Sequence, residues 1–162
     1  MSPSGAEGSQ REPAPHEGFR KREMTRVLLD TGPLVAILSR DDAYHEACVS
    51  ALRAMPGPLL SCWPVITEAA WLLRRSPRVV QQLLRSIDGR FLELLPLASE
   101  EAEPIAVLMK RYEEIRPQLA DATLIYLAHR ERIDTIFTLD RRDFSIYRSG
   151  RKRSFHLVPE IE

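Results

Sequence analysis

The stretch Arg26-Val27-Leu28-Leu29-Asp30-Thr31-Gly32-Pro33-Leu34 decides the fold of this chain. Its apolar run of strand-forming residues predicts a buried strand over residues 26–30. Gly32-Pro33 then ends the strand and opens a helix over 33–38. Asp30 stands between the two, and a carboxylate beside an apolar core is costly unless it is paired, hydrogen-bonded or bound to a metal. Because sites form at the carboxyl ends of strands in open α/β sheets, Asp30 is the first candidate site residue.

The rest of the chain alternates predicted strands with predicted helices. Strands are expected over residues 59–62, 91–95 and 134–139, with an edge strand near 155–158. Helices are expected over 43–55, 64–75, 79–87, 99–115 and 120–130, the fourth of them capped by Ser99. This alternation predicts an α/β fold, a three-layer sandwich with a mostly parallel central sheet flanked by helices.

Composition fits one globular domain. Of 162 residues, 44% are hydrophobic and 28% charged, and 23 Lys and Arg balance 23 Asp and Glu. Net charge therefore gives no indication of a nucleic-acid partner. Cys48 and Cys62 lack the spacing of a zinc site or disulfide framework and are expected to pack as small hydrophobic residues. Without a membrane-spanning run or a signal-peptide core, a cytoplasmic location is the default expectation.

The first residues differ from the rest in composition. Residues 1–24 are rich in Ser, Gly, Pro, Glu and Arg, which predicts a disordered N-terminal tail. Met24 stands just before the first predicted strand and is an alternative translation start. The domain itself is expected over residues 25–162.

Two further acids resemble Asp30 in position. Asp140 ends the strand predicted over 134–139, and Glu68 lies in the first half of the helix predicted over 64–75. Taken alone, Asp30 could be a helix cap, Asp140 a residue of a solvated turn, and Glu68 a single solvent-facing glutamate.

Asp121 is the fourth acid, and it shares a helix face with apolar residues. It begins the pattern Asp121, Leu124, Ile125, Ala128, which occupies positions i, i+3, i+4 and i+7. Asp121 could cap the helix, but a carboxylate above a core-facing stripe is more easily explained by a bound cation.

Together the four acids predict a metal centre. Strand ends and the helix starts that follow them lie on one edge of a parallel sheet. Four carboxylates there would repel one another without a counter-charge, and oxygen ligands suit Mg²⁺ or Mn²⁺. Such ions serve phosphodiester hydrolysis, because one can activate water and a second can stabilise the leaving oxygen.

The acidic motifs carry a family resemblance. In order they are Leu29-Asp30-Thr31-Gly32-Pro33-Leu34, Thr67-Glu68, Ala120-Asp121-Ala122 and Thr138-Leu139-Asp140-Arg141-Arg142-Asp143-Phe144. This order resembles that of PIN-domain ribonucleases, and most of all the VapC-type toxins of bacterial toxin–antitoxin pairs. The resemblance covers roughly residues 26–158, so that 25–162 would form a PIN-like nuclease domain.

The resemblance implies an activity and partners. The activity would be Mg²⁺- or Mn²⁺-dependent endoribonuclease hydrolysis of RNA through metal-activated water. Asp30, Glu68 and Asp121 would hold the metal, with Asp140 as the fourth acid, Asp143 as an alternative to it, and a helping hydroxyl on Thr138. VapC-type proteins commonly form homodimers and are held inactive by a small antitoxin protein, so both are expected here.

A basic segment follows the last acid and could bind RNA phosphates. It comprises Arg141, Arg142, Arg148, Arg151, Lys152 and Arg153. The ordinary alternative is a solvated loop, and Arg74, Arg75 and Arg78 form a weaker cluster with the same ambiguity. Tyr147 and Phe155 could stack on bases or belong to the core. Trp63 and Trp71 flank Glu68 at i and i+8, and we interpret both as packing residues.

Other functions explain the sequence less well. A non-catalytic RNA- or protein-binding module with the same fold would make the four acids structural. An aspartyl phosphatase would need a second acid two residues after Asp30, where Gly32 stands. A dinucleotide-binding enzyme would need a Gly-x-Gly-x-x-Gly motif after the first strand.

Overall fold

A parallel sheet of five short strands forms the centre of the molecule. The computed structural model describes residues 25–55, 57–150 and 153–160, so the predicted tail at 1–24 lies outside the described residues. The strands are β1 (Val27–Leu29), β2 (Leu59–Ser61), β3 (Leu92–Leu94), β4 (Thr135–Phe137) and β5 (His156–Val158). Every pairing is parallel, in the order β3-β2-β1-β4-β5. β1 and β4, which precede Asp30 and Asp140, are therefore neighbours.

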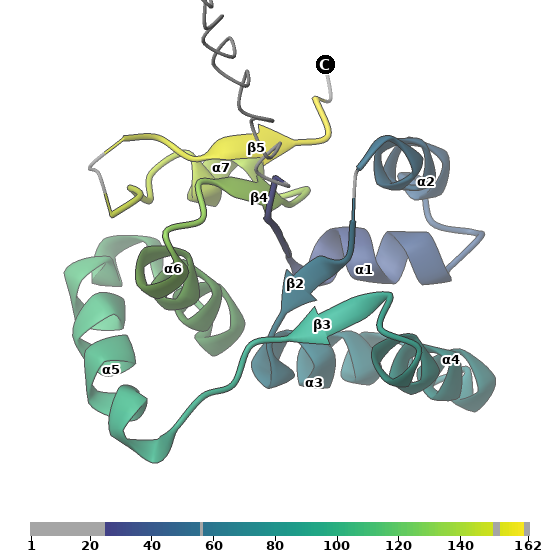
Figure 1. The fold of residues 1–162 in the computed structure, drawn as a ribbon, viewed down its shortest axis with the longest axis horizontal. Coiled ribbons are helices and arrows are strands. Elements are labelled where there is room, and N and C mark those ends of the chain that lie inside the picture. The colour runs from purple at the N-terminus through teal and green to yellow at the C-terminus, as the bar shows by residue number, and fades with distance from the viewer. Residues whose placement is uncertain (1–24, 56, 151–152, 161–162) are drawn as a thin grey trace, which may run out of the picture.

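Helices connect the strands and cover both faces of the sheet, which gives the expected three-layer α/β sandwich. They are α1 (Thr31–Leu38), α2 (His45–Ala54), α3 (Trp63–Leu72), α4 (Pro77–Asp88), α5 (Ala102–Arg111), α6 (Leu119–Glu131) and α7 (Arg141–Phe144). In Figure 1, α1 and α2 lie on one side of the sheet, and α5 and α6 lie on the other. A parallel sheet needs such double cover because both of its faces are apolar.

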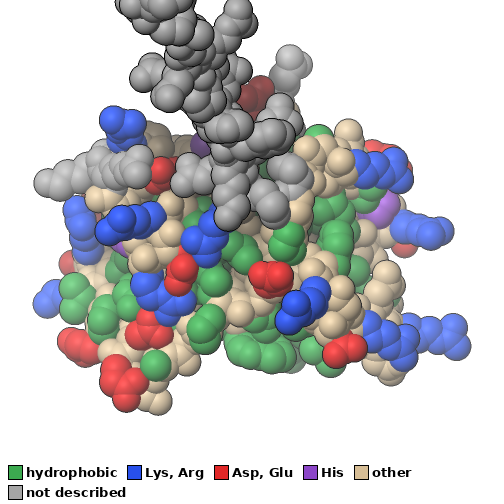
Figure 2. Space-filling model, in the orientation of Figure 1, with side chains coloured by type: hydrophobic (Ala, Val, Ile, Leu, Met, Phe, Trp, Pro, Cys, Tyr) green, Lys and Arg blue, Asp and Glu red, His purple; other side chains and the backbone are tan. Residues whose placement is uncertain are grey.

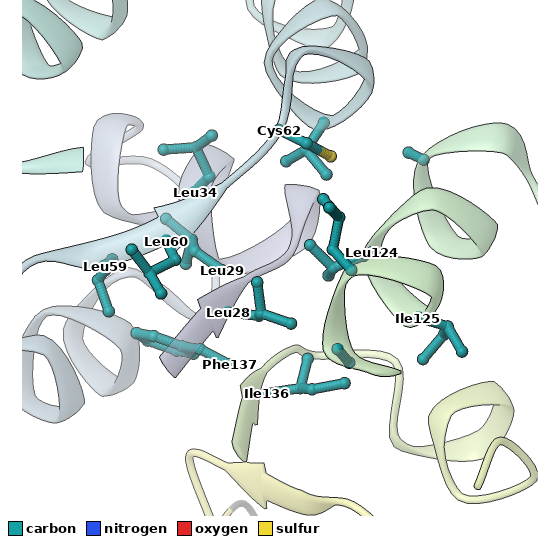
Figure 3. Close-up of a cluster of buried hydrophobic side chains, with 14 of the residues drawn as sticks. Leu28, Leu29, Leu34, Leu59, Leu60, Cys62, Leu124, Ile125, Ile136 and Phe137 are labelled. Atoms are coloured by element: carbon teal, nitrogen blue, oxygen red, sulfur yellow. The ribbon is translucent and has the colours of Figure 1, made fainter. Parts of the chain in front are cut away.

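The core follows from alternation along the strands. Leu28 and Leu29 are both buried, and successive strand residues point to opposite faces. Figure 3 shows Leu28 on the side of α6, near Leu124, and Leu29 on the side of α1, near Leu34. Strand β1 therefore packs against both helical layers, which fixes the position of its carboxyl end.

Both cysteines also belong to this packing. Cys48 and Cys62 are buried and free, as expected from their spacing. Burial raises the pKa of each thiol to about 11, so both stay protonated at neutral pH and behave as small apolar side chains.

Two sequence expectations need correction. The single helix expected over 99–115 is instead η1 (Ser99–Glu101), α5 and η2 (Glu113–Ile115). Ser99 is the first residue of η1 and not its N-cap, which is Ala98. The Glu101 side chain accepts the backbone N–H of Ala98 at 2.7 Å. The segment after Asp140 was expected only as a motif, yet it forms the short helix α7.

Charged side chains are spread over the surface. Figure 2 shows Lys, Arg, Asp and Glu side chains interspersed with hydrophobic ones over the visible face, in keeping with the balanced net charge. Among the described residues, no helix is long and apolar enough to cross a membrane.

Candidate metal centre

Asp30 lies at the floor of the candidate site, directly after β1, with 5% of its surface exposed. It occupies the N-cap position of α1, but its side chain makes no capping hydrogen bond. The hydroxyl of Thr138 donates to Asp30 Oδ2 at 2.8 Å, and the same hydroxyl accepts the backbone N–H of Asp140 at 3.0 Å. Thr138 therefore links the residues that follow β1 and β4.

Glu68 is fixed from the second turn of α3. Its Oε2 accepts a hydrogen bond of 2.6 Å from the hydroxyl of Thr31, the buried first residue of α1. The side chain of Glu68 is half-buried. It is therefore not a freely solvated glutamate but points back toward the residue that follows Asp30.

Asp121 lies in the first turn of α6 and is half-buried. Its Oδ2 accepts the backbone N–H of Gln118, the N-cap residue, at 3.3 Å. Leu124, Ile125 and Ala128 are all buried, as expected for the face that Asp121 shares. The helix start and the core stripe together place this carboxylate at the carboxyl edge of the sheet.

Asp140 and Asp143 stand together at α7. Asp140 Oδ1 accepts the backbone N–H of Asp143 at 3.0 Å and so caps this helix. Asp140 is exposed and Asp143 is half-buried. The capping bond uses one oxygen of Asp140 and none of Asp143, so both carboxylates keep free acceptors.

The pKa values show that these acids influence one another. Burial, above all, raises the pKa of Asp30 from 3.8 to about 7; the hydrogen bond from Thr138 opposes this rise, and the charges of Asp121 and Glu68 add to it. Burial also raises the pKa of Asp121 to about 6, with further contributions from Glu68, Asp140 and Asp143. Acids from separate elements thus form one cluster of unfavourable negative charge.

The donor set fits a hard divalent cation. Among the described residues, no Lys, Arg or His forms an ion pair with any of these five acids. Within the same residues, no three His, Cys, Asp or Glu side chains converge closely enough to form a complete ligand set. Mg²⁺ needs only one or two protein carboxylates and keeps several waters. Oxygen donors with uncompensated charge are what such an ion prefers.

The basic segment after Asp140 is partly engaged within the fold. The Arg141 guanidinium donates to the carbonyl of Pro159, and Arg148 donates to the three backbone carbonyls of residues 145–147, which follow α7. Arg142 and Arg153 are exposed. Arg151 and Lys152 lie outside the described residues. Arg142 and Arg153 are therefore the described members that are best placed to meet a phosphate.

The burial of four aromatic residues differs from what the sequence suggested. Tyr147 and Phe155 are buried, and Tyr147 packs edge-on against Tyr112 and Phe144, so neither can stack on a base. Trp63 and Trp71, interpreted as packing residues, are 57% and 64% exposed. That interpretation was wrong, because helical spacing alone does not show which face meets the core.

Thr31 is the site residue that sequence reasoning missed. It lies next to Asp30, where it was counted only as part of a motif. Its hydroxyl reaches Glu68, 37 residues away. A β-branched hydroxyl residue directly after a strand-terminal acid was the available signal, but its partner could not be known before the fold.

Comparisons with known proteins bear on the family and the fold of this chain. The sequence profile of the PIN domain matches residues 27–149. The chain is 30% identical over 135 residues to Ribonuclease VapC26 of Mycobacterium tuberculosis, covering 82% of this chain and all of that protein. Its fold is similar to the crystal structure of Mycobacterium tuberculosis VapC20, described as a sarcin–ricin loop cleaving toxin, with a TM-score of 0.67 and 17% identity over 72% of this chain and 92% of the other. At that identity, the second likeness concerns the fold alone.

Proposed function

Because this chain belongs to the PIN domain family, with a VapC-type ribonuclease among its relatives, we propose that it is an endoribonuclease that hydrolyses RNA with Mg²⁺ or Mn²⁺. Asp30, Glu68 and Asp121 hold the metal. Asp140 is the fourth acid, and Asp143 is its alternative. The observation that supports this most strongly is the cluster of five acids at one sheet edge with no cationic partner among the described residues.

The chain's own residues prepare the site for catalysis. Thr138 orients the buried carboxylate of Asp30, and Thr31 orients Glu68. Partners of this kind fix the direction of ligand oxygens before a metal arrives. Asp121 and Asp143 are half-exposed, so they lie where a phosphodiester can approach. A divalent ion bound there supplies water of lowered pKa and charge stabilisation at the phosphate.

The biological setting comes from the VapC relative. We propose that the protein is the toxin of a toxin–antitoxin pair, that a small antitoxin protein restrains it, and that it acts as a homodimer. Arg142 and Arg153 are the described basic residues that would contact RNA phosphates. A gene for a small protein with a DNA-binding N-terminus beside this one would support the pairing.

Cleavage of a mixed RNA pool tests the function. Wild type with Mg²⁺ or Mn²⁺ is expected to cleave, whereas Asp121→Asn, folded as judged by circular dichroism, is expected to lose nearly all activity. Asp134→Asn is a matched control, because Asp134 is an exposed acid just before β4, at the opposite edge of the sheet.

The outcomes separate the alternatives. Equal cleavage by wild type and Asp121→Asn would place the catalytic site elsewhere. A wild-type protein that neither cleaves the pool nor binds Mn²⁺ by calorimetry would favour the non-catalytic binding module. Comparing Asp140→Asn with Asp143→Asn in the same assay identifies the fourth acid.

A further inference from the structure

An aromatic groove opens beside the acid cluster. It has a volume of about 590 Å³ and runs between α3 and the start of α6. Its walls include Trp63, Thr67, Glu68 and Trp71 on one side and Gln118 and Leu119 on the other. The two tryptophans are separated by two helical turns, about 12 Å along the axis of α3.

The apolar side chains of this groove are unusually exposed. Trp63 and Trp71 show 57% and 64% of their surface, and Leu119 shows 57%. Large aromatic residues normally bury most of their area, and contiguous exposed apolar surface commonly marks a binding site. Three large apolar side chains are therefore exposed to solvent here and do not belong to the buried core.

The groove is continuous with the acid cluster. Glu68 lines the groove and also accepts the hydrogen bond from Thr31 beside Asp30. Gln118 lines it too, and its backbone N–H donates to Asp121. Anything that occupies the groove must therefore lie against Glu68, and against Gln118, which is hydrogen-bonded to Asp121.

The far end of the groove carries positive charge. The guanidinium carbon of Arg74 lies 4.0 Å from the ring centroid of Trp71, and Arg74 is anchored by a 2.7 Å hydrogen bond to the Trp71 carbonyl. Arg74 therefore covers one face of the indole, yet Trp71 remains 64% exposed. Arg75 and Arg78 follow and are exposed. A nucleic-acid strand that left the acid cluster along the groove would thus meet exposed aromatic rings and then the guanidinium of Arg74.

We propose that this groove is a subsite for unpaired nucleobases that flank the cleaved phosphodiester bond. The inference rests on the proposed ribonuclease function and extends it to substrate recognition. Aromatic platforms bind bases of any sequence through their π-faces, and nearby arginine adds to the stacking. The arrangement favours RNA over a second copy or a protein helix, because the exposed Arg74, Arg75 and Arg78 follow the groove-lining helix and can meet RNA phosphates.

The subsite selects unpaired over paired RNA. Bases within a duplex are stacked on one another and cannot reach Trp63 or Trp71, whereas bases in loops can be splayed out onto aromatic side chains. The groove therefore gives this nuclease a preference for loops and single strands that phosphate contacts alone would not provide.

Intrinsic fluorescence reports on this groove specifically, because Trp63 and Trp71 are the only two tryptophans of the chain. Emission is recorded while a single-stranded adenosine decamer is added, for wild type with EDTA and for Asp121→Asn with Mg²⁺, so that cleavage does not intervene. Saturable quenching is expected, and a duplex of the same length should quench far less.

Variants then measure the contribution of each ring, with end-labelled RNA and fluorescence anisotropy as the readout. Trp63→Ala and Trp71→Ala are each expected to weaken binding of the decamer by roughly 5- to 150-fold, the range for loss of one base–aromatic stack. Phe91→Ala is the matched control, because Phe91 is an exposed aromatic residue just before β3, at the opposite sheet edge, and should bind as wild type does.

The result distinguishes this inference from the proposed function. If wild type cleaves RNA but the tryptophan variants bind and cleave equally well, the subsite is overturned and the nuclease stands. If RNA quenches the tryptophans but nothing is cleaved, the subsite stands without the nuclease. If RNA quenches neither protein, and sedimentation shows that Trp63→Ala and Trp71→Ala convert a wild-type dimer to monomers, the groove is a self-association surface and the proposal fails.

Discussion

Thr138 donates its hydroxyl to the carboxylate of Asp30 at 2.8 Å, across 108 residues of sequence. The same oxygen accepts the N–H of Asp140 at 3.0 Å. Because Thr138 is fully buried, the two bonds are shielded from water and define one orientation of the Asp30 side chain. One hydroxyl thus connects, by hydrogen bonds, the residues that follow two neighbouring strands.

Replacing Thr138 with valine tests this link. Thr138→Val keeps the β-branched shape and removes both hydrogen bonds, so we expect a 10- to 100-fold loss in divalent-metal affinity or RNA cleavage. Thr138→Ser retains the hydroxyl and should keep most of the activity. Calorimetry with Mn²⁺ and a cleavage assay give the two readouts. Thr135→Val, at the start of β4, is the control, and an equal loss in that variant would show that the effect is general.

Thr31 should act on metal binding only through Glu68. Thr31→Val frees the glutamate, so we expect about a tenfold drop in Mn²⁺ affinity, and Thr31→Ser should restore it. The decisive comparison is a double-mutant cycle. In a Glu68→Ala background, Thr31→Val should have no further effect, whereas a full additional loss would mean that Thr31 acts by another route.

Without metal, the protein should become less stable as pH rises. The pKa of Asp30 is about 7 in the fold and 3.8 ordinarily, so between these values the folded state binds more protons than the unfolded state. Stability to unfolding therefore falls from about pH 4 to about pH 7 and stays low above that. Asp121, with a pKa of about 6, contributes in the same direction.

Asp30→Asn should remove most of this loss. Urea unfolding in EDTA at pH 8 should show the variant more stable than wild type by several kcal/mol, since each pKa unit corresponds to about 1.4 kcal/mol. At pH 4 the two proteins should be nearly equal. Saturating Mn²⁺ should stabilise wild type far more than the variant. A variant less stable than wild type at pH 8 would contradict the assigned burial of the charge.

Tyr147→Phe is expected to stabilise the protein by about 1 kcal/mol. The Tyr147 hydroxyl is buried, and no hydrogen-bond partner for it exists among the described residues. Burying an unsatisfied hydroxyl costs free energy. Phenylalanine keeps the edge-on contacts with Tyr112 and Phe144, whose ring centroids lie 4.9 and 5.4 Å away. Urea unfolding with an unchanged m-value measures the gain, and destabilisation would show that the hydroxyl has a partner.

The sequence predicted the acids because their signal is local. A carboxylate after an apolar strand, as at Asp30 and Asp140, is unusual wherever the strand packs, and parallel strands bring their ends to one edge. All five strands were expected because each is a short local run of strand-forming residues. The short helix α7 was missed because four residues are too few for a periodic pattern.

Other features depended on contacts that no local pattern specifies. The partner of Thr31 lies on another helix, and the exposure of Trp63 and Trp71 depends on which face of α3 meets the sheet. Nη1 of Arg148, a predicted phosphate ligand, donates to three nearby backbone carbonyls, which its sequence neighbours did not indicate. A sequence shows which side chains are charged or aromatic, but it does not show which residues they contact in the fold.

The strand order also determines when activity can arise during biosynthesis. β4 inserts beside β1 although more than a hundred residues separate them, and it brings Thr138 and Asp140 to Asp30. A ribosome that has translated β1 to α6 has therefore made a chain with only part of its acid cluster. If the proposed site assignment holds, a nascent chain therefore lacks a complete acid cluster until β4 and Asp140 have been synthesised.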